Sequence, residues 1–472
     1  MKNKVLKAGI GYTFGNYLLK GLSFLTLPIF ARLLTTEDYG IYNIYLSYES
    51  IIYIILGLTF HASFRNAKYK YKDKFNEYVS NCVLVTLISL GIWLLMSNIF
   101  YSLYKDIINL NRIAINLLLF HSFGTTILTD YNTYVGIDYQ YQSFLKISAI
   151  NALSNIILSI IFILTIFDSE RYLGRIMGTA IPIILISIII SILFFKKAKP
   201  TIKKEYTKYA FKYSLPIIPH GLSQIVLSQF DRIMINTMVG ASQAGIYSFA
   251  YNIFSIVSVT GASIDQVWQP WFYEKMAEKN LRAIYHRANE LIIGMGILIS
   301  CIILVSPEII HVLGTEAYDE AKYVVIPILI GGYFTFLYNI PASVEYYYAK
   351  TKFIAVGTML AALLNILLNS LVIPIYGYVA AAYTTLVTYF LYFLFHSILA
   401  FYIEKKMVFS ILKTFFISFS MILTAIITFV FMEKFVYRWG IVGLFIITSI
   451  FWIENKYHIL NKKNKLITRE LR

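Results

Sequence analysis

Long apolar runs separated by short polar segments dominate this chain. Each run holds roughly 20 residues, the length that a helix needs to cross about 30 Å of hydrocarbon. We place the spans at residues 9–33, 41–62, 79–103, 113–136, 144–166, 173–195, 211–238, 245–269, 290–312, 323–348, 353–374, 379–402, 408–431 and 439–453. The pattern predicts an all-α polytopic membrane protein with about 14 transmembrane helices.

Composition supports a membrane protein. Of the 472 residues, 58% are hydrophobic and 14% are charged, which is far from the balance of soluble proteins. The two cysteines, Cys82 and Cys301, lie in separate spans, so we expect neither a disulfide framework nor a metal site. The first apolar run lacks a small-residue cleavage site, and we interpret it as a retained helix rather than a signal peptide.

The positive charges are distributed unevenly over the loops. With the N-terminus in the cytoplasm, the inner segments hold 31 of the 41 Lys and Arg residues, the outer segments hold seven, and three lie within spans. Because cytoplasmic loops are enriched in Lys and Arg, this split predicts a cytoplasmic-membrane protein with both termini inside. The net charge of +16 is dispersed rather than gathered on one surface, so we expect contact with membrane lipids and no nucleic acid.

An internal repeat relates two halves of the chain. A shift of 205 positions lays GIY at 40–42 over GIY at 245–247, and a second echo pairs NALSN at 151–155 with NILLN at 365–369. Each echo lies six spans from its partner. Since six is even, both halves cross the membrane in the same sense, as in transporters with parallel repeats.

The repeat and the charge pattern define four predicted regions. Residues 1–195 form an N-lobe of helices 1–6, and 196–208 form a basic cytoplasmic linker. Residues 209–402 form a C-lobe of helices 7–12. Residues 403–472 hold helices 13 and 14 and a basic cytoplasmic tail.

Three stretches resemble a known family. LPIFARLLTTEDYGIY (27–42), DRIMINTMVGASQAGIYSFAY (231–251) and NILLNSLVIPIYGYVAAAYTT (365–385) are similar to the polysaccharide-type flippases of the multidrug/oligosaccharidyl-lipid/polysaccharide exporter (MOP) superfamily. The resemblance implies two parallel six-helix lobes plus two extra C-terminal helices around a central cavity.

The same resemblance implies a function. Flippases of this type move an isoprenoid-diphosphate-linked oligosaccharide, such as an O-antigen or capsule repeat unit, from the inner to the outer leaflet by alternating access. It therefore implies a lipid-linked oligosaccharide as partner and a role in cell-surface polysaccharide synthesis. Contact with other polysaccharide-assembly proteins stays open, as does the identity of the sugar.

Basic residues within spans are candidates for substrate binding, because an ionisable group at bilayer depth costs several kcal/mol. Lys20 lies near the middle of the first span, and Arg232 lies about six residues from the outer end of the seventh. We expect both to line the cavity and to attract a diphosphate. A structural ion pair for Lys20 and a side chain of Arg232 that reaches the interface are the alternatives.

Acidic residues carry two different expectations. Glu49, about eight residues from the outer end of its span, is expected at the cavity, where it pairs with Lys20 or binds a coupling cation such as H⁺ or Na⁺. Asp231 is expected to hold the orientation of its helix through a neighbouring helix. For Asp130, Asp265 and Glu345, close to cytoplasmic span ends, we expect solvated positions at the mouth.

Several further residues are expected to be structural. Asn365 and Asn369, four apart on one helix face, are predicted to bond a neighbouring helix. Arg175, near the outer end of its span, is predicted to be interfacial. The prolines within spans are hinge candidates for lobe movement, with static kinks as the alternative: Pro28, Pro216 and Pro219.

Two rival functions are considered. A cation-coupled multidrug exporter of the same superfamily shares the predicted fold, but a cationic substrate calls for deep acidic residues, whereas the deep charges here are mostly basic. A membrane polysaccharide polymerase or glycosyltransferase is disfavoured, since every outer loop has about ten residues or fewer and no Asp-x-Asp occurs. We therefore expect no catalytic residues, no metal site and no cofactor, and we leave a coupling ion open.

Overall fold

The computed structural model describes residues 2–108 and 110–457, and these residues form helices, turns and loops without a β-strand. Every predicted span except the tenth contains a long helix, and nine helical stretches of the described chain are apolar enough to cross a membrane. The all-helical membrane fold is therefore confirmed. The long helices are α1 (Lys2–Leu33), α2 (Thr36–Gly57), α4 (Phe75–Ile99), α6 (Arg112–Ile137), α7 (Tyr141–Thr165), α8 (Arg171–Lys197), α10 (Ile217–Met238), α11 (Ala241–Ala277), α12 (Leu281–Leu313), α15 (Thr351–Tyr376), α16 (Tyr378–Glu404), α17 (Ile411–Val430) and α18 (Phe435–Tyr457).

Shorter helices complete the chain. The tenth predicted span is split into α13 (Ala321–Leu337) and α14 (Asn339–Tyr347). The others lie at loops and span ends: α3 (His61–Tyr71), α5 (Tyr101–Ile108) and α9 (Lys204–Ser214), with 3₁₀ turns at Lys72–Lys74 and Glu316–Tyr318.

Contacts divide the described chain into two compact units. Unit 1 comprises the chain up to Asn252 together with Leu313–Tyr318 and Lys352–Thr388. Unit 2 comprises Ile253–Val312, Asp319–Thr351 and the chain from Tyr389 onward. The boundary falls inside α11 and α16, so these units differ from the lobes expected from the repeat. The units are defined by contacts in space, whereas the lobes are defined by a repeat in the sequence. The lobes therefore stay a prediction.

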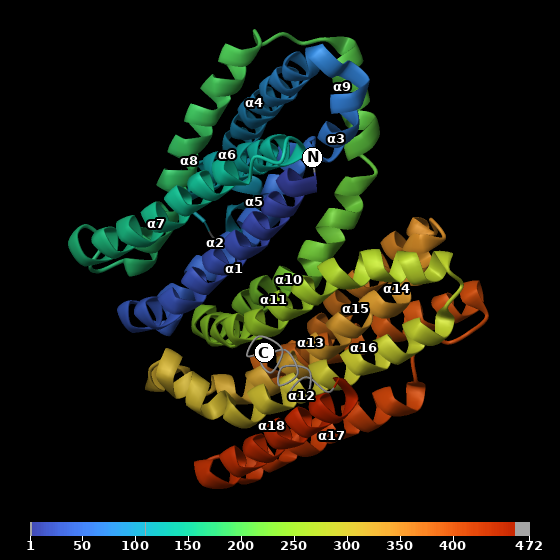
Figure 1. Ribbon diagram of the computed structural model, residues 1–472. Helices are drawn as coiled ribbons and strands as arrows, with labels where there is room; N and C mark the ends of the chain where they lie inside the picture. Colours follow the sequence, from blue (N-terminus) through green and yellow to red (C-terminus); the bar gives the residue numbers. More distant parts are fainter. Residues whose placement is uncertain (1, 109, 458–472) are drawn as a thin grey trace, which may run out of the picture. The chain divides into compact units, whose positions relative to one another are not determined.

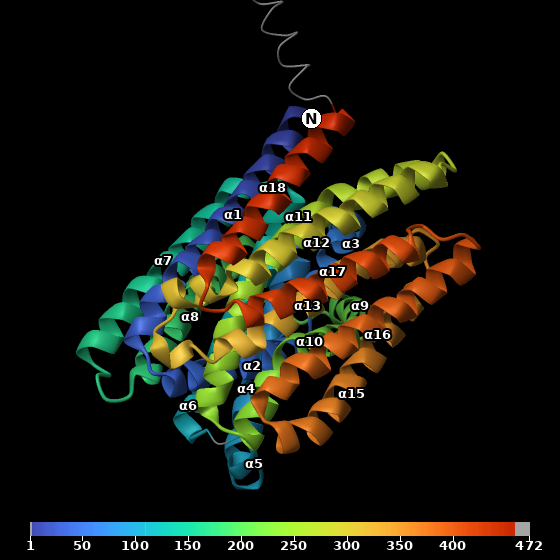
Figure 2. The ribbon, with the colours of Figure 1, turned by 90° about the horizontal axis from the view of Figure 1, so that it is seen from below.

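In unit 1, helices α6, α7 and α8 pack side by side (Figure 1). Helix α2 packs against α6 and α10, and α1 runs along α7 (Figure 2). An aromatic core fills the space between α3, α4, α6 and α9, with Phe60, Phe64 and Tyr78 almost fully buried. Such rings contribute large buried areas and favour edge-to-face contacts.

Local sequence signals explain where several helices begin and end. Thr35 and Asp38 form a capping box at the start of α2, which satisfies backbone N–H groups that lack helical partners. Gly377 separates α15 from α16 with φ of +74°, a left-handed conformation that glycine adopts without steric cost.

The structure corrects the seventh predicted span. Residues 211–238 do not form one helix, since α9 ends at Ser214 and α10 begins at Ile217. Pro216 lies between the two helices, where its missing N–H breaks the ladder of backbone hydrogen bonds. The basic linker is also anchored: the Lys203 amide donates to Asn81 Oδ1 at 2.8 Å, and its ammonium pairs with Glu77 of α4.

The two GIY motifs of the repeat contact each other within unit 1. A Cβ atom at Gly40 would lie 1.8 Å from the carbonyl oxygen of Ala241, and one at Gly245 would lie 2.0 Å from that of Thr36. Only glycine permits this approach of α2 to the start of α11. The hydroxyls of Thr36 and Ser242 bond at 2.7 Å beside it.

Unit 2 is organised around α13, which is hydrophobic on all sides and almost entirely buried, as expected of a helix enclosed by others. Helix α18 is longer than the predicted span 439–453. Arg438 holds the helix against α12. Its guanidinium donates two hydrogen bonds to the Glu308 carboxylate and one to the Leu304 carbonyl. Arg438 is 2% exposed.

Candidate functional site

A polar cavity of about 290 Å³ lies in unit 1. Five helices contribute to its walls: α1, α2, α7, α8 and the first part of α11. Its lining combines aromatic rings, side-chain amides and one guanidinium: Thr26, Leu27, Phe30, Tyr39, Tyr42, Asn43, Leu46, Ala152, Asn155, Ile156, Arg175 and Asn252. A mixture of rings and amides beside a cation suits a ligand with hydroxyl and anionic groups.

Arg175 is the cation of this cavity. Its Nη1 donates to Asn155 Oδ1 at 2.6 Å and to Ser159 Oγ at 2.7 Å. Its guanidinium carbon lies 3.7 Å from the centre of the Phe30 ring and 4.7 Å from that of Tyr42. These contacts fix the side chain. Nε and Nη2 make no hydrogen bond with the described residues, so two nitrogens are left for an anionic ligand.

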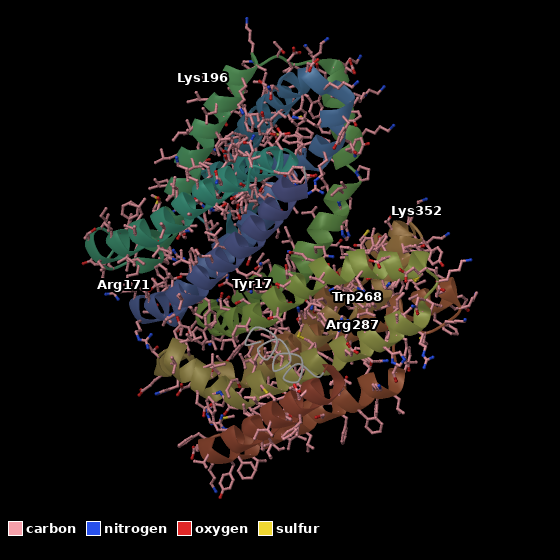
Figure 3. The ribbon with its side chains drawn as sticks, in the orientation of Figure 1. Tyr17, Arg171, Lys196, Trp268, Arg287 and Lys352 are labelled. Atoms are coloured by element: carbon pink, nitrogen blue, oxygen red, sulfur yellow. The ribbon has the colours of Figure 1, made fainter. Side chains whose placement is uncertain are left out.

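Arg171 marks the start of α8 (Figure 3). Arg175 lies one turn further along the helix. Its position near a span end led us to predict an interfacial residue. The structure shows that the side chain instead faces the cavity, because α1, α2 and α7 pack around this turn. Three arginine or lysine residues within spans were recognised in the sequence, but the direction of each side chain depends on packing.

Amide groups and a phenol form another part of the cavity lining. Asn252 Nδ2 donates to the Tyr39 hydroxyl at 2.9 Å, and Asn43 Nδ2 donates to the Tyr39 carbonyl at 2.7 Å. Tyr39 therefore joins α2 to α11 at the cavity through its bond with Asn252.

Arg232 is adjacent to the cavity but does not line it. Its Nη1 donates to the Ser228 carbonyl at 2.6 Å and to Gln229 Oε1 at 2.7 Å, and the guanidinium lies 4.5 Å from the Tyr251 ring centre. The side chain is 7% exposed. Its guanidinium is therefore held by groups outside the cavity lining in this conformation.

Asp231 lies in a network that joins four helices of unit 1. Its carboxylate accepts hydrogen bonds from Tyr247 at 2.7 Å, Thr385 at 2.8 Å and Asn369 at 2.7 Å. Asn365 belongs to the same network, since it accepts from Asn369 at 3.2 Å and donates to Thr385 at 3.2 Å. The network connects α10 with α11, α15 and α16, and all of its members are buried.

The other predicted site residues whose side chains are described lie outside the cavity lining. Glu49 is 7% exposed, and its Oε1 has no hydrogen-bond partner among the described residues. The backbone of Lys20 belongs to α1, but its side chain lies outside the described residues. Pro28 lies within α1, and Pro219 lies in the first turn of α10.

Two acidic residues depart from their predicted positions. Asp130 and Glu345 were expected at a solvated mouth, but both are completely buried. Asp265 is half-buried and accepts a hydrogen bond from Gln269 at 3.1 Å. Closeness to a span end therefore does not make a carboxylate exposed when a further helix covers it.

A second cavity, of about 380 Å³, lies in unit 2. Trp268 of α11 and Arg287 of α12 line it and lie near each other (Figure 3). The rest of the lining is mostly apolar: Thr260, Ser263, Ile264, Val267, Trp271 and Leu291. Arg287 already forms an ion pair with Glu290 at 2.7 Å, so this cavity offers less for a polar ligand than the one around Arg175.

Comparisons with known proteins agree on the class of this fold. The sequence profile of the family described as polysaccharide biosynthesis protein matches residues 5–276, more than half of the chain. A curated Lsg locus protein of Haemophilus influenzae is 25% identical over 385 residues, which cover 77% of this chain and 90% of that protein.

Solved transporters share the fold at low sequence identity. The lipid II flippase MurJ in an inward closed conformation aligns with a TM-score of 0.76 at 15% identity, over 94% of this chain and 99% of that one. An inward-facing multidrug transporter of the MATE family, within the MOP superfamily, aligns with a TM-score of 0.62 at 15% identity, over 82% and 95%. The profile match shows that the chain belongs to the polysaccharide biosynthesis protein family, and the structural likenesses show that it shares the fold of these membrane transporters.

Proposed function

We propose that the chain translocates an isoprenoid-diphosphate-linked oligosaccharide repeat unit from the inner to the outer leaflet of the cytoplasmic membrane, for cell-surface polysaccharide synthesis. The carrying observation is the cavity of unit 1, where Arg175 keeps two nitrogens unbonded beside amide and aromatic groups. Both termini are proposed to be cytoplasmic, on the strength of the Lys and Arg distribution.

The cavity chemistry fits both parts of such a headgroup. A diphosphate carries several negative charges, and a guanidinium offers paired donors that match phosphate oxygens. Asn43, Asn155 and Asn252 offer donors and acceptors for sugar hydroxyls, while Tyr39 and Tyr42 offer ring faces. We retain Lys20 and Arg232 as further sources of positive charge along the route.

Alternating access is the proposed mechanism. The predicted lobes, 1–195 and 209–402, would rock about the shared site as parallel repeats do. In the predicted topology, Thr36 and Ser242 lie at the outer ends of α2 and α11, and their hydroxyls are in contact. We therefore interpret this conformation as closed on the outer side, with Pro28, Pro216 and Pro219 as hinge candidates.

Two buried carboxylates of unit 1 are proposed for a coupling cation. The buried Oε1 of Glu49 has no hydrogen-bond partner among the described residues, so the carboxylate could bind a proton there. Asp231 accepts hydrogen bonds from Tyr247, Asn369 and Thr385, and these amide and hydroxyl side chains also carry oxygens, the ligands that hard cations prefer, which rotation of the side chains would turn toward a cation. A bound cation would supply positive charge that compensates the buried carboxylate.

A multidrug exporter is the second candidate, since the MATE fold is shared. The observation against it is the cation in the cavity: an amphipathic cationic substrate would be repelled by Arg175. An enzyme is disfavoured because the solved relatives are transporters.

Deletion of the chain in its host tests this proposal. We expect a lipid-linked saccharide to accumulate on the cytoplasmic side of the membrane, and mass spectrometry of the lipid extract would identify the sugar. Complementation with Arg175→Gln should fail at normal abundance, Arg175→Lys should restore part of export, and the exposed Arg282→Gln should restore all of it. Normal surface polysaccharide and no accumulated lipid in the deletion strain would exclude the proposal.

A further inference from the structure

Two buried acidic side chains have no role in the cavity described above. Asp130 lies in the last two turns of α6, and Glu345 lies near the end of α14. These helices correspond to the fourth span of each predicted lobe, and both ends are cytoplasmic in the predicted topology. Each carboxylate is 0% exposed, and each has a histidine beside it.

The pair in unit 2 is Glu345 with His396 of α16. His396 Nδ1 lies 2.6 Å from Glu345 Oε1, and both side chains are 0% exposed. Glu345 Oε2 and His396 Nε2 have no hydrogen-bond partner among the described residues. A contact of this length requires a proton between the two atoms, because a carboxylate oxygen and an imidazole lone pair are both acceptors.

The pair in unit 1 is Asp130 with His61 of α3. His61 Nδ1 lies 3.8 Å from Asp130 Oδ1. Both oxygens of Asp130 and the Nδ1 atom of His61 are without a hydrogen-bond partner among the described residues. An ionised carboxylate in such surroundings, with a neutral imidazole beside it, would be a buried unpaired charge, which costs several kcal/mol.

Few other ionisable groups face these pairs. Cys82 of α4 interacts electrostatically with Asp130. In unit 2, Tyr346 interacts with Glu345, and the rings of Tyr338 and Tyr392 pack on His396. The carboxylate of Asp265 interacts electrostatically with the hydroxyls of Tyr338 and Tyr346. Among the described residues, no Lys or Arg forms an ion pair with either carboxylate. A bound proton is therefore the positive charge that can balance the negative charge of each carboxylate.

We propose that each carboxylate–histidine pair is a proton-binding latch. One bound proton makes the pair neutral overall and lets it stay buried, which keeps the cytoplasmic end of the fourth helix packed on α3 in unit 1 and on α16 in unit 2. A pair that loses this proton carries an unpaired negative charge, which is more stable in water than in the protein interior. The cytoplasmic end of the fourth helix then separates from its neighbour. The link of opening to transport rests on the proposed function, whereas proton binding does not.

The protonation state is tested on the full-length protein reconstituted in lipid at neutral pH. Infrared spectra report protonated carboxyl groups, and nitrogen NMR of labelled histidine reports imidazolium. Comparison with Asp130→Asn, Glu345→Gln, His61→Gln and His396→Gln assigns the signals, and Glu205→Gln is the control, since Glu205 is 70% exposed. We expect one proton in each pair, on the acid or on the imidazole. A pair with no proton, or with two, overturns the proposal.

The latch itself is tested through Cys82, which is fully buried on α4, a helix that packs against α6. In a Cys301→Ser background, maleimide labelling of Cys82 is measured against pH and divided by the rate of a free thiol, because thiolate is the reactive form. We expect the ratio to rise on the order of tenfold at alkaline pH, and Asp130→Asn to abolish this rise.

A second variant keeps the test decisive if Asp130→Asn fails to insert. His61→Gln should shift the pH at which Cys82 becomes accessible, since it removes one of the two proton-binding groups. Identical pH profiles for the variants and the parent protein would overturn the latch. Both measurements proceed without substrate, so their failure is separate from a failure of the transport proposal.

Discussion

Thr36 Oγ1 lies 2.7 Å from Ser242 Oγ, so the outer end of α2 meets the start of α11 through a direct hydrogen bond. The two residues sit beside the two GIY motifs that revealed the internal repeat. Sequence similarity between these segments thus coincides with a physical contact between them. In the predicted topology the contact closes the outer side of the transporter.

A disulfide across this contact should lock the chain. We expect Thr36→Cys with Ser242→Cys to crosslink under mild oxidation and to stop export, because rocking lobes must separate their outer ends. Reduction should restore export. Each single cysteine variant serves as the control, and full export by the crosslinked protein would contradict alternating access at this contact.

Gly40 should tolerate no side chain. Gly40→Ala places a Cβ 1.8 Å from a backbone oxygen, and relief of such overlap requires backbone shifts that cost about 1–3 kcal/mol. We expect weaker crosslinking at Thr36 and Ser242 and a lower thermal midpoint. Gly91→Ala is the matched control, since a Cβ there meets no atom within 4 Å. Equal effects of the two variants would contradict the close packing.

Asp231→Asn should separate a structural role from a cation site. The substitution removes the charge that three donors satisfy, and we expect a stability loss on the order of 3 kcal/mol if the network only orients the helices. Abundance and thermal unfolding report this loss. Loss of sodium-dependent export at normal abundance would instead assign the cluster to a coupling ion, and an unchanged variant would exclude both roles.

Arg438 should hold α18 in place. Arg438→Met breaks the fork of a buried arginine with Glu308, which is 30% exposed. Removal of one partner of a fully buried pair costs about 3–5 kcal/mol, and we expect a smaller loss here because water reaches Glu308. Replacing both residues, as Arg438→Met with Glu308→Leu, should recover part of the loss. Thermal unfolding in detergent measures it, with the exposed Lys434→Met as control. Equal midpoints for Arg438→Met and the control would show that the pair contributes nothing.

The spans were predictable because crossing a membrane depends mainly on the length and hydropathy of a run. The break before α10 was missed although Pro216 marks it, since the apolar pattern continues across that residue. The longer α18 was missed for the opposite reason: aromatic and polar residues at its ends dilute the apolar run.

The site was less predictable than the spans. Arg175 depends on Phe30 and Asn155, which lie in other helices far along the chain. Span position alone says nothing of the direction in which a side chain points. Asp130 and Glu345 show the same limit, because α3 and α16 supply the histidines that cover them.

The most direct test of the central claim measures translocation by the purified chain. Lipid-linked saccharide isolated from the deletion strain is placed in proteoliposomes, and its exposure to a membrane-impermeant oxidant is followed with time. We predict that the wild-type chain speeds translocation, that Arg175→Gln slows it at least about tenfold, equivalent to about 1.4 kcal/mol, and that Arg175→Lys is intermediate. Equal rates for the wild type, Arg175→Gln and the control Arg282→Gln at equal incorporation would contradict the account.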